Sequence, residues 1–487
     1  MKKILPVAVL AALAGVNAAQ AVHVNSDGLG QVLLYPYYST EGDNDTYIAL
    51  ANTTSEYKAV KIRILESMNS NEVLDFNLYM SPYDHWSAVI TSAADEASID
   101  VEGATLRSAD TSCTVPLAVS QGDTIAFREY VYDGDSESGL DRTQEGYVEI
   151  IEMGVITDPV LQAAIKHGSH SDGEGGTEWR PANCAFLDAQ WRDGGEWLPP
   201  SGDADYGMSG VTGGLYGYGV LINVEDGTSA GYDATAIDAF ADDFQLPGAL
   251  HQEPGNVQPS LADATDEITI FNEGDAVNYT LDDGLDAVSA ILMATSISND
   301  YVADEGRNAK TDWILTMPTK RQYVNVEDPD EDPAEPPFTD VWDGKTACEE
   351  VSIEFWDREE AFEDVPSDVG FSPRPPQVEI PATSLCTEVS VLGFGSESAV
   401  KAGAAIYSGI GDSISGAGFS EGWARVGFDT EGHELQAESG DIFLGLPVIG
   451  FAVQTVRNEN ANPAADSVIA NYAASVEHKS VLEVDPD

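Results

Sequence analysis

The chain has 487 residues, of which 84 are Asp or Glu and 22 are Lys or Arg, so its formal net charge is −62. A surface this acidic repels nucleic acid and anionic lipid, and we therefore expect no nucleic-acid partner. Hydrophobic residues make up 43% of the chain, which is enough for a folded protein of two or three domains.

Residues 1–21 predict a secretory signal peptide. Lys2 and Lys3 precede a short apolar run, and Ala19-Gln20-Ala21 has the small-x-small pattern of a cleavage site. A buried N-terminal helix is the alternative reading. No later run is long and apolar enough to predict a transmembrane segment. We therefore expect export to the periplasm, the cell surface or the medium.

Alternation of apolar and polar residues predicts half-buried strands early in the chain. In residues 59–66 the apolar side chains of Val60, Ile62 and Ile64 alternate with Lys61 and Arg63, which we expect to face solvent. Residues 74–80 and, much later, 351–355 alternate in the same way, and Gly, Asn and Asp punctuate the β-rich runs between them.

The acidic stretch "YDGDSESGLDRTQEG" (132–146) approaches the ligand spacing of a calcium-binding EF-hand loop. If Asp133 is position 1, acids occupy positions 3, 5 and 9, and the candidate calcium ligands are Asp133, Asp135, Glu137 and Asp141. The pattern then departs, because Gln144 stands where a bidentate Glu belongs. The residues on both sides of this stretch predict strands, so the alternative is that it forms a solvated turn at the tip of a hairpin. Ca²⁺ is the one cofactor that we expect.

Helices are few in this reading. Asp158-Pro159 predicts a helix start and Gly168 its end. Residues 233–244 place Ile237, Phe240 and Phe244 at helical spacing, which predicts a second, core-facing helix. The Pro-rich, acidic segment at 326–340 predicts an exposed loop.

The four cysteines predict two disulfides. An even number of cysteines in an exported chain is typical of disulfide bonding. Four cysteines can pair in three ways, and we favour the scheme in which each of the two disulfides stays within one half of the chain. These are Cys113–Cys184 and Cys348–Cys386. No pair has C-x-x-C spacing, which argues against a zinc site.

Together these patterns predict an all-β, mainly antiparallel protein with a few short helices. We expect two immunoglobulin-like (Ig-like) β-sandwich domains, an N-terminal one at 22–230 and a C-terminal one at 231–487. "DTYIALANTT" (45–54) is echoed by "TDWILTMPT" (311–319), and a charged strand follows each of them. Internal duplication and chance both explain this echo.

Four strings in the chain resemble those of an uncharacterised group of secreted bacterial proteins. They are "SPYDHW" (81–86), "EGYVEIIEMG" (145–154), "TDWILTMPTKRQYV" (311–324) and "GLPVIGFAVQ" (445–454). The resemblance implies a common β-rich fold and export. It implies no activity and no catalytic residue.

Motifs for enzyme chemistry are weak. Ser413 in "GDSISG" (411–416) lacks the histidine and acid motifs of a serine hydrolase, so we expect no catalytic residue there. A metal site could be formed by His167, His170 and Cys184, but we do not expect these side chains to point toward one common metal ion. A tryptophan platform for sugars would lie in "EWLPPSGDADYG" (196–207), although such residues more often belong to a core.

We therefore expect a secreted or cell-surface structural or adhesive protein rather than an enzyme. Its partners would be further copies of the chain or components of the envelope or extracellular matrix, with cations screening its charge to allow self-assembly. The alternative is a secreted hydrolase or a carbohydrate-binding protein.

Overall fold

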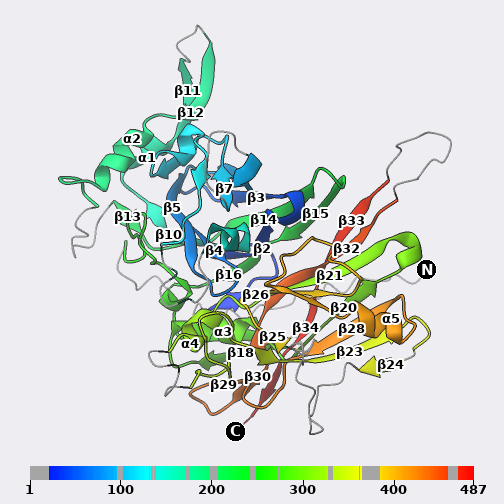
Figure 1. Cartoon of the computed structure of the whole chain (residues 1–487). Coiled ribbons are helices and arrows are strands. Elements are labelled where there is room, and N and C mark those ends of the chain that lie inside the picture. Colours follow the sequence, from blue (N-terminus) through cyan, green and yellow to red (C-terminus); the bar gives the residue numbers. More distant parts are fainter. Residues whose placement is uncertain are drawn as a thin grey trace, which may run out of the picture.

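The computed structural model describes most of the chain (Figure 1). The described residues are 21–95, 103–130, 132, 135, 139–171, 176–197, 207–241, 248–272, 275–326, 329, 333–360, 362–364, 384–458 and 470–486. Residues 1–20, which hold most of the expected signal peptide, lie outside them, as does part of the acidic loop at 326–340.

The first half of the chain forms two facing antiparallel sheets, here called sheet I and sheet II. Sheet I has, in spatial order, β1 (His23–Val24), β16 (Thr235–Asp238), β2 (Val32–Ser39), β10 (Glu145–Ile156), β4 (Lys58–Glu66), β5 (Glu72–Met80) and β8 (Cys113–Val115), with β13 (Met208–Ser209) also on β10. Sheet II has β15 (Thr228–Asp233), β14 (Leu215–Asn223), β3 (Asn44–Asn52), β6 (His85–Ser92), β7 (Ala104–Arg107) and β9 (Ile125–Ala126). The domain boundary expected at 230/231 falls inside β15.

The second half also forms two facing sheets, III and IV. Sheet III has β24 (Phe362–Asp364), β23 (Ser352–Asp357), β28 (Glu421–Gly427), β20 (Ser296–Val302) and β34 (Lys479–Val481). Sheet IV has β27 (Tyr407–Gly409), β26 (Val389–Gly393), β21 (Ala309–Thr316), β32 (Ile449–Val456) and β33 (Tyr472–Glu477). The expectation of a mainly antiparallel β-protein is confirmed.

The strand order of the second half repeats that of the first. Sheet III matches sheet I strand by strand in spatial order: β34-β20-β28-β23-β24 correspond to β16-β2-β10-β4-β5. Sheet IV matches sheet II in the same way: β33-β32-β21-β26-β27 correspond to β15-β14-β3-β6-β7. All ten pairs also follow the same order along the chain. One pairing differs, because β27 runs parallel to β26 whereas β7 is antiparallel to β6. The echoed strings lie on β3 and β21, which are equivalent strands, and this agreement supports internal duplication over chance.

Short elements connect and extend the sheets. The remaining strands are β11 (His167–Ser171) with β12 (Thr177–Pro181), β17 (Glu267–Asn272) with β18 (Asp275–Thr280), β19 (Met293–Ala294) with β31 (Leu446–Pro447), β22 (Glu349–Glu350) with β25 (Ser384–Leu385), and β29 (Glu434–Gln436) with β30 (Ile442–Leu444) and β35 (Glu483–Asp485). The α-helices are α1 (Pro159–Ile165), α2 (Cys184–Gln190), α3 (Gly284–Leu292), α4 (Lys320–Val324) and α5 (Gly411–Gly416). Short 3₁₀ helices are η1 (Glu41–Asp43), η2 (Ala93–Asp95), η3 (Val119–Gln121), η4 (Leu140–Gln144), η5 (Leu261–Asp263) and η6 (Glu305–Arg307). The β11–β12 hairpin projects as an arm from the first half (Figure 1).

The helix expected to start at Pro159 is confirmed, whereas the helix expected at 233–244 is wrong. The Asp158 side chain accepts hydrogen bonds from the amides of Val160 and Leu161, which caps α1. In the second segment the chain forms β16 instead, and β16 pairs with β2 and β1. Backbone pairing with a strand on each side outweighs a helical spacing of only three apolar residues.

The expectation that Lys61 and Arg63 face solvent is also wrong, because β4 is buried on both faces. Lys61 pairs with Asp75, and Arg63 pairs with Glu149 at 2.5 Å. The loop around Glu253 covers this face, and its carbonyl accepts a hydrogen bond from Lys61. The ion pairs compensate Lys61 and Arg63 for the water that the covering loop excludes.

Hydrophobic packing is continuous between the two halves. One cluster of buried side chains joins Leu33 and Tyr37 of sheet I to Ile314 and Val391 of sheet IV. Polar contacts tie the same interface, since the amide of Val389 donates to the Ser67 carbonyl at 2.9 Å. The halves therefore form a single packed body, in which functional surfaces can also form between them.

Candidate functional site

The structure describes only two of the four candidate calcium ligands. Asp133 and Glu137 lie outside the described residues, and the segment connects β9 of sheet II to β10 of sheet I rather than forming the tip of a hairpin. Asp141 is exposed at the start of η4. Calcium binding by these residues stays a prediction.

Asp135 is already engaged by other groups. Its side chain is 2% exposed and pairs with Arg142 at 2.6 Å. It also accepts hydrogen bonds from the Trp342 indole at 2.8 Å and from the Asn71 amide at 3.1 Å. Asp135 therefore ties the first half to the second. Among the described residues, no group of three or more His, Cys, Asp or Glu is arranged to hold a metal ion.

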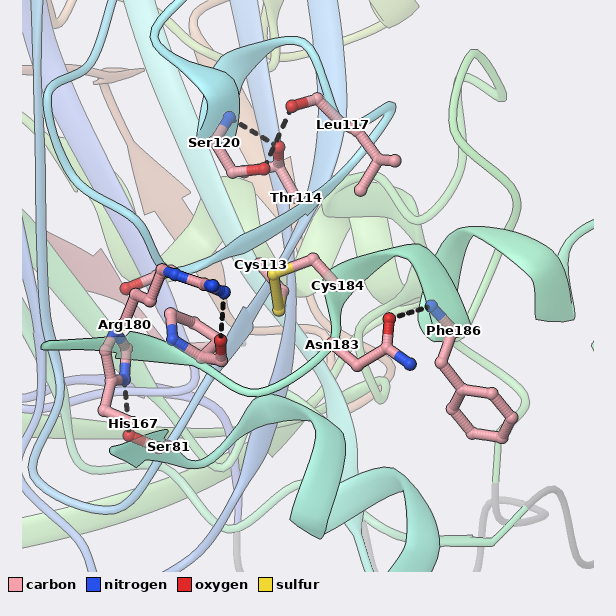
Figure 2. The surroundings of a disulfide bond; sticks show 12 residues. Ser81, Cys113, Thr114, Leu117, Ser120, His167, Arg180, Asn183, Cys184 and Phe186 are labelled. Atoms are coloured by element: carbon pink, nitrogen blue, oxygen red, sulfur yellow. Dashed lines mark hydrogen bonds between the residues drawn. A yellow bond between two sulfur atoms is a disulfide. The ribbon is translucent and has the colours of Figure 1, made fainter. Parts of the chain in front are cut away.

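The cysteines form the two expected disulfides. Cys113 of β8 bonds Cys184 at the start of α2, as Figure 2 shows, and Cys348 bonds Cys386. Because its sulfur is in a disulfide, Cys184 cannot act as a thiolate ligand in the candidate metal site that includes His167. Two disulfides agree with an oxidising compartment.

A serine, a histidine and an acid meet beside the first disulfide, but not in a catalytic geometry. Ser81 Oγ lies 3.3 Å from His167 Nδ1, and Asp84 Oδ2 lies 3.7 Å from the same nitrogen (Figure 2 shows the serine and histidine). A catalytic triad needs the serine and the acid on different ring nitrogens. Ser413 lies on α5, and no histidine within the described residues is hydrogen-bonded to it.

The most distinctive exposed surface is the open face of sheet III. Alternation along β23 and β28 turns Ile353, Phe355 and Val426 into the core, whereas Trp356 and Trp423 point outward. The two indole rings are stacked, with centroids 4.0 Å apart and planes 8° from parallel. They are direct cross-strand neighbours, which brings them together without a loop.

Polar groups surround this tryptophan pair. Asp300 of β20 is exposed and is the cross-strand neighbour of Trp423. The Arg425 guanidinium lies 5.5 Å from the centre of the Trp356 ring and pairs with Glu354. The surface therefore combines an aromatic wall with two carboxylates and a guanidinium. We call Asp300, Glu354, Trp356, Trp423 and Arg425 the tryptophan face.

The segment 196–207, weighed above as a sugar platform and as part of a core, lies apart from the tryptophan face. In the segment 196–207 the described Trp197 is only 1% exposed and stacks on Tyr79, with Trp191 and His251 packed around it. It is a core residue, as the alternative reading stated. The alternation of apolar and polar residues along 351–355 could have indicated Trp356. That pattern assigns the strand face of Glu354 to solvent, and Trp356 lies on the same face. "EGWARVG" (421–427) was not recognised as a strand, so its Trp423 was missed.

Comparison of the chain with models of protein families, with curated protein sequences and with solved structures finds no match. In the described part of the chain, no helix combines the length and the apolarity that a membrane crossing needs.

Proposed function

We propose that this is an exported, non-catalytic adhesive protein that holds a neutral polysaccharide on the tryptophan face. The observation that carries the proposal is the stacked Trp356–Trp423 pair on an open sheet face, with Trp423 39% exposed. Large aromatic side chains gathered on the surface of a sheet are typical of an interaction site.

The chemistry of the surface fits a sugar ring. One face of a pyranose carries only C–H groups, which pack on an indole, whereas its edge carries hydroxyls. Asp300, Glu354 and Arg425 supply charged hydrogen-bond groups at the edge of the aromatic wall. The net charge of −62 repels anionic polymers, which favours a neutral chain.

Location in the envelope or extracellular matrix is part of the proposal. The signal-like residues 1–21 and the two disulfides support export. We propose that each half is a β-sandwich scaffold. It resembles an Ig-like domain in having two facing sheets, but its strand order differs, because β2 pairs with β10 and β16 rather than with β3. Self-association of the matrix-bound protein, promoted by cations, remains the accompanying prediction.

Affinity electrophoresis tests the proposal. The exported protein is run through gels containing neutral polysaccharides (glucans, mannans, soluble chitin derivatives) and, separately, anionic ones. We expect retardation by at least one neutral polymer, and its loss in Trp423→Ala. Trp179→Ala is the matched control, because Trp179 is 69% exposed but lies on the projecting β12 (Figure 1). Retardation by no neutral polymer, or equal loss in both variants, would reject the proposal.

A further inference from the structure

A large cleft lies between the two halves, apart from the tryptophan face. Its volume is about 820 Å³, within the range of small-molecule sites. The repeated strands line it from both halves: β14, β15 and β16 on one side face their counterparts β32, β33 and β34 on the other. The cleft therefore depends on how the two repeats pack, and neither half could form it alone.

Part of the cleft lining is apolar and aromatic. Tyr232 and Phe451 stack with centroids 4.5 Å apart, and both are buried. Met293 and Ile449 add aliphatic surface. Tyr216 also lines the cleft and is 40% exposed, so part of its surface is available to a ligand.

The charges at the cleft all have one sign. Asp27, Asp233 and Glu477 are exposed among the lining residues, and the lining contributed by the described part of the chain includes no Lys or Arg. His478 adds no positive charge, because its Nε2–H donates to the Ile314 carbonyl and its Nδ1 accepts from Asn299, which satisfies the neutral ring. Burial also lowers the pKa of His478 to about 4.

We propose that this cleft binds an organic cation with an apolar body, of the quaternary ammonium class. Three carboxylates attract the positive charge, and the face of an exposed tyrosine suits an alkylated ammonium group through a cation–π contact. The apolar part of the lining would take the hydrocarbon part, whereas an anionic ligand would meet three carboxylates. This inference does not rest on polysaccharide binding.

The test uses benzyltrimethylammonium as the probe and benzenesulfonate as an anion of similar size. Binding to the full exported protein is measured by calorimetry at constant ionic strength. We expect saturable binding of the cation and at least tenfold weaker binding of the anion. Equal binding of both ions, or no saturable binding of the cation, would overturn the proposal.

Variants locate the site. Asp233→Asn combined with Glu477→Gln should weaken binding of the cation about tenfold, and Tyr216→Ala should weaken it several-fold. The control is Glu305→Gln with Glu434→Gln, which makes the same change in net charge at exposed positions outside the cleft. Circular dichroism confirms that each variant is folded. Unchanged affinity in the cleft variants, or an equal loss in the control, would contradict this location.

Discussion

Glu145 is a buried carboxyl at the junction of the two halves. Its side chain accepts a hydrogen bond from the Tyr37 hydroxyl at 2.6 Å and another from the Gly403 amide at 3.0 Å. Burial raises the pKa of Glu145 to about 7, because the charged form loses its hydration. The folded protein therefore keeps a proton on this group that the unfolded chain, with an ordinary Glu pKa, gives up.

This difference makes stability fall as the pH rises. Between the ordinary Glu pKa and about 7 the folded state binds more protons than the unfolded state, so the free energy of unfolding decreases by a few kcal/mol across that window, at about 1.4 kcal/mol per unit of pKa shift. We expect Glu145→Gln to flatten the decline between about pH 4 and pH 7, measured by urea unfolding. Glu397→Gln, at an exposed carboxylate with a lowered pKa, should not. An unchanged slope in Glu145→Gln would contradict this account of the junction.

Lys58 and Glu152 form an ion pair that is fully buried. Lys58 Nζ lies 2.7 Å from Glu152 Oε1, both side chains are 0% exposed, and the Gly213 amide donates to the same carboxylate. Lys58→Met should destabilise the protein by about 3–5 kcal/mol, because an unpaired carboxylate is left in the core. The double variant with Glu152→Gln should recover part of this loss. Additive losses in chemical denaturation would show that the two residues are not coupled.

At the level of elements, each disulfide closes a long loop. The sequence separations are 71 residues for Cys113–Cys184 and 38 for Cys348–Cys386. The chain-entropy model gives about 4 kcal/mol for each loop, with a difference of less than about 1 kcal/mol between them. We expect a Cys→Ser double variant of either pair to lose a similar stability in urea. Intact mass of the exported protein should show both bonds, and four alkylatable thiols would contradict them.

The sequence predicted those elements whose pattern is local, and it missed those that depend on the rest of the fold. The cap at Asp158 and each of the two echoed strings, on β3 and β21, are patterns of consecutive residues, so they could be read directly. The covered face of β4 and the strand at 235–238 depend on segments that are distant in sequence, namely the loop near Glu253 and the partner strand β2. Trp423 was missed because the strand β28 was not recognised, and its pairing with Trp356 joins residues that are far apart in the chain.

At the scale of the whole molecule, the net charge of −62 dominates. Like charges repel one another in the compact state, and salt screens them. We expect the melting temperature to rise by several degrees as NaCl increases from about 0.05 to about 0.5 M, where the Debye length shrinks from about 14 to about 4 Å. A melting temperature that is independent of NaCl would contradict this view of the surface.

Calcium is tested against this background of screening. If residues 133–141 bind Ca²⁺, millimolar calcium should raise the melting temperature more than NaCl of matched ionic strength, and Asp133→Asn with Asp141→Asn should remove part of the increment. Asp135 is left intact in this test, because its carboxylate holds Arg142 and Trp342. An increment that these variants leave unchanged would exclude this segment.

The central claim is that a packed, duplicated β-protein holds a neutral polysaccharide on its tryptophan face without cleaving it. The most direct measurement is calorimetric titration with an oligosaccharide of the polymer that retards the protein most, followed by analysis of the recovered sugar. We predict saturable binding, an affinity about tenfold or more lower in Trp423→Ala but unchanged in Trp179→Ala, and an intact oligosaccharide. Equal affinities of the wild type and Trp423→Ala, or a cleaved oligosaccharide, would contradict the claim.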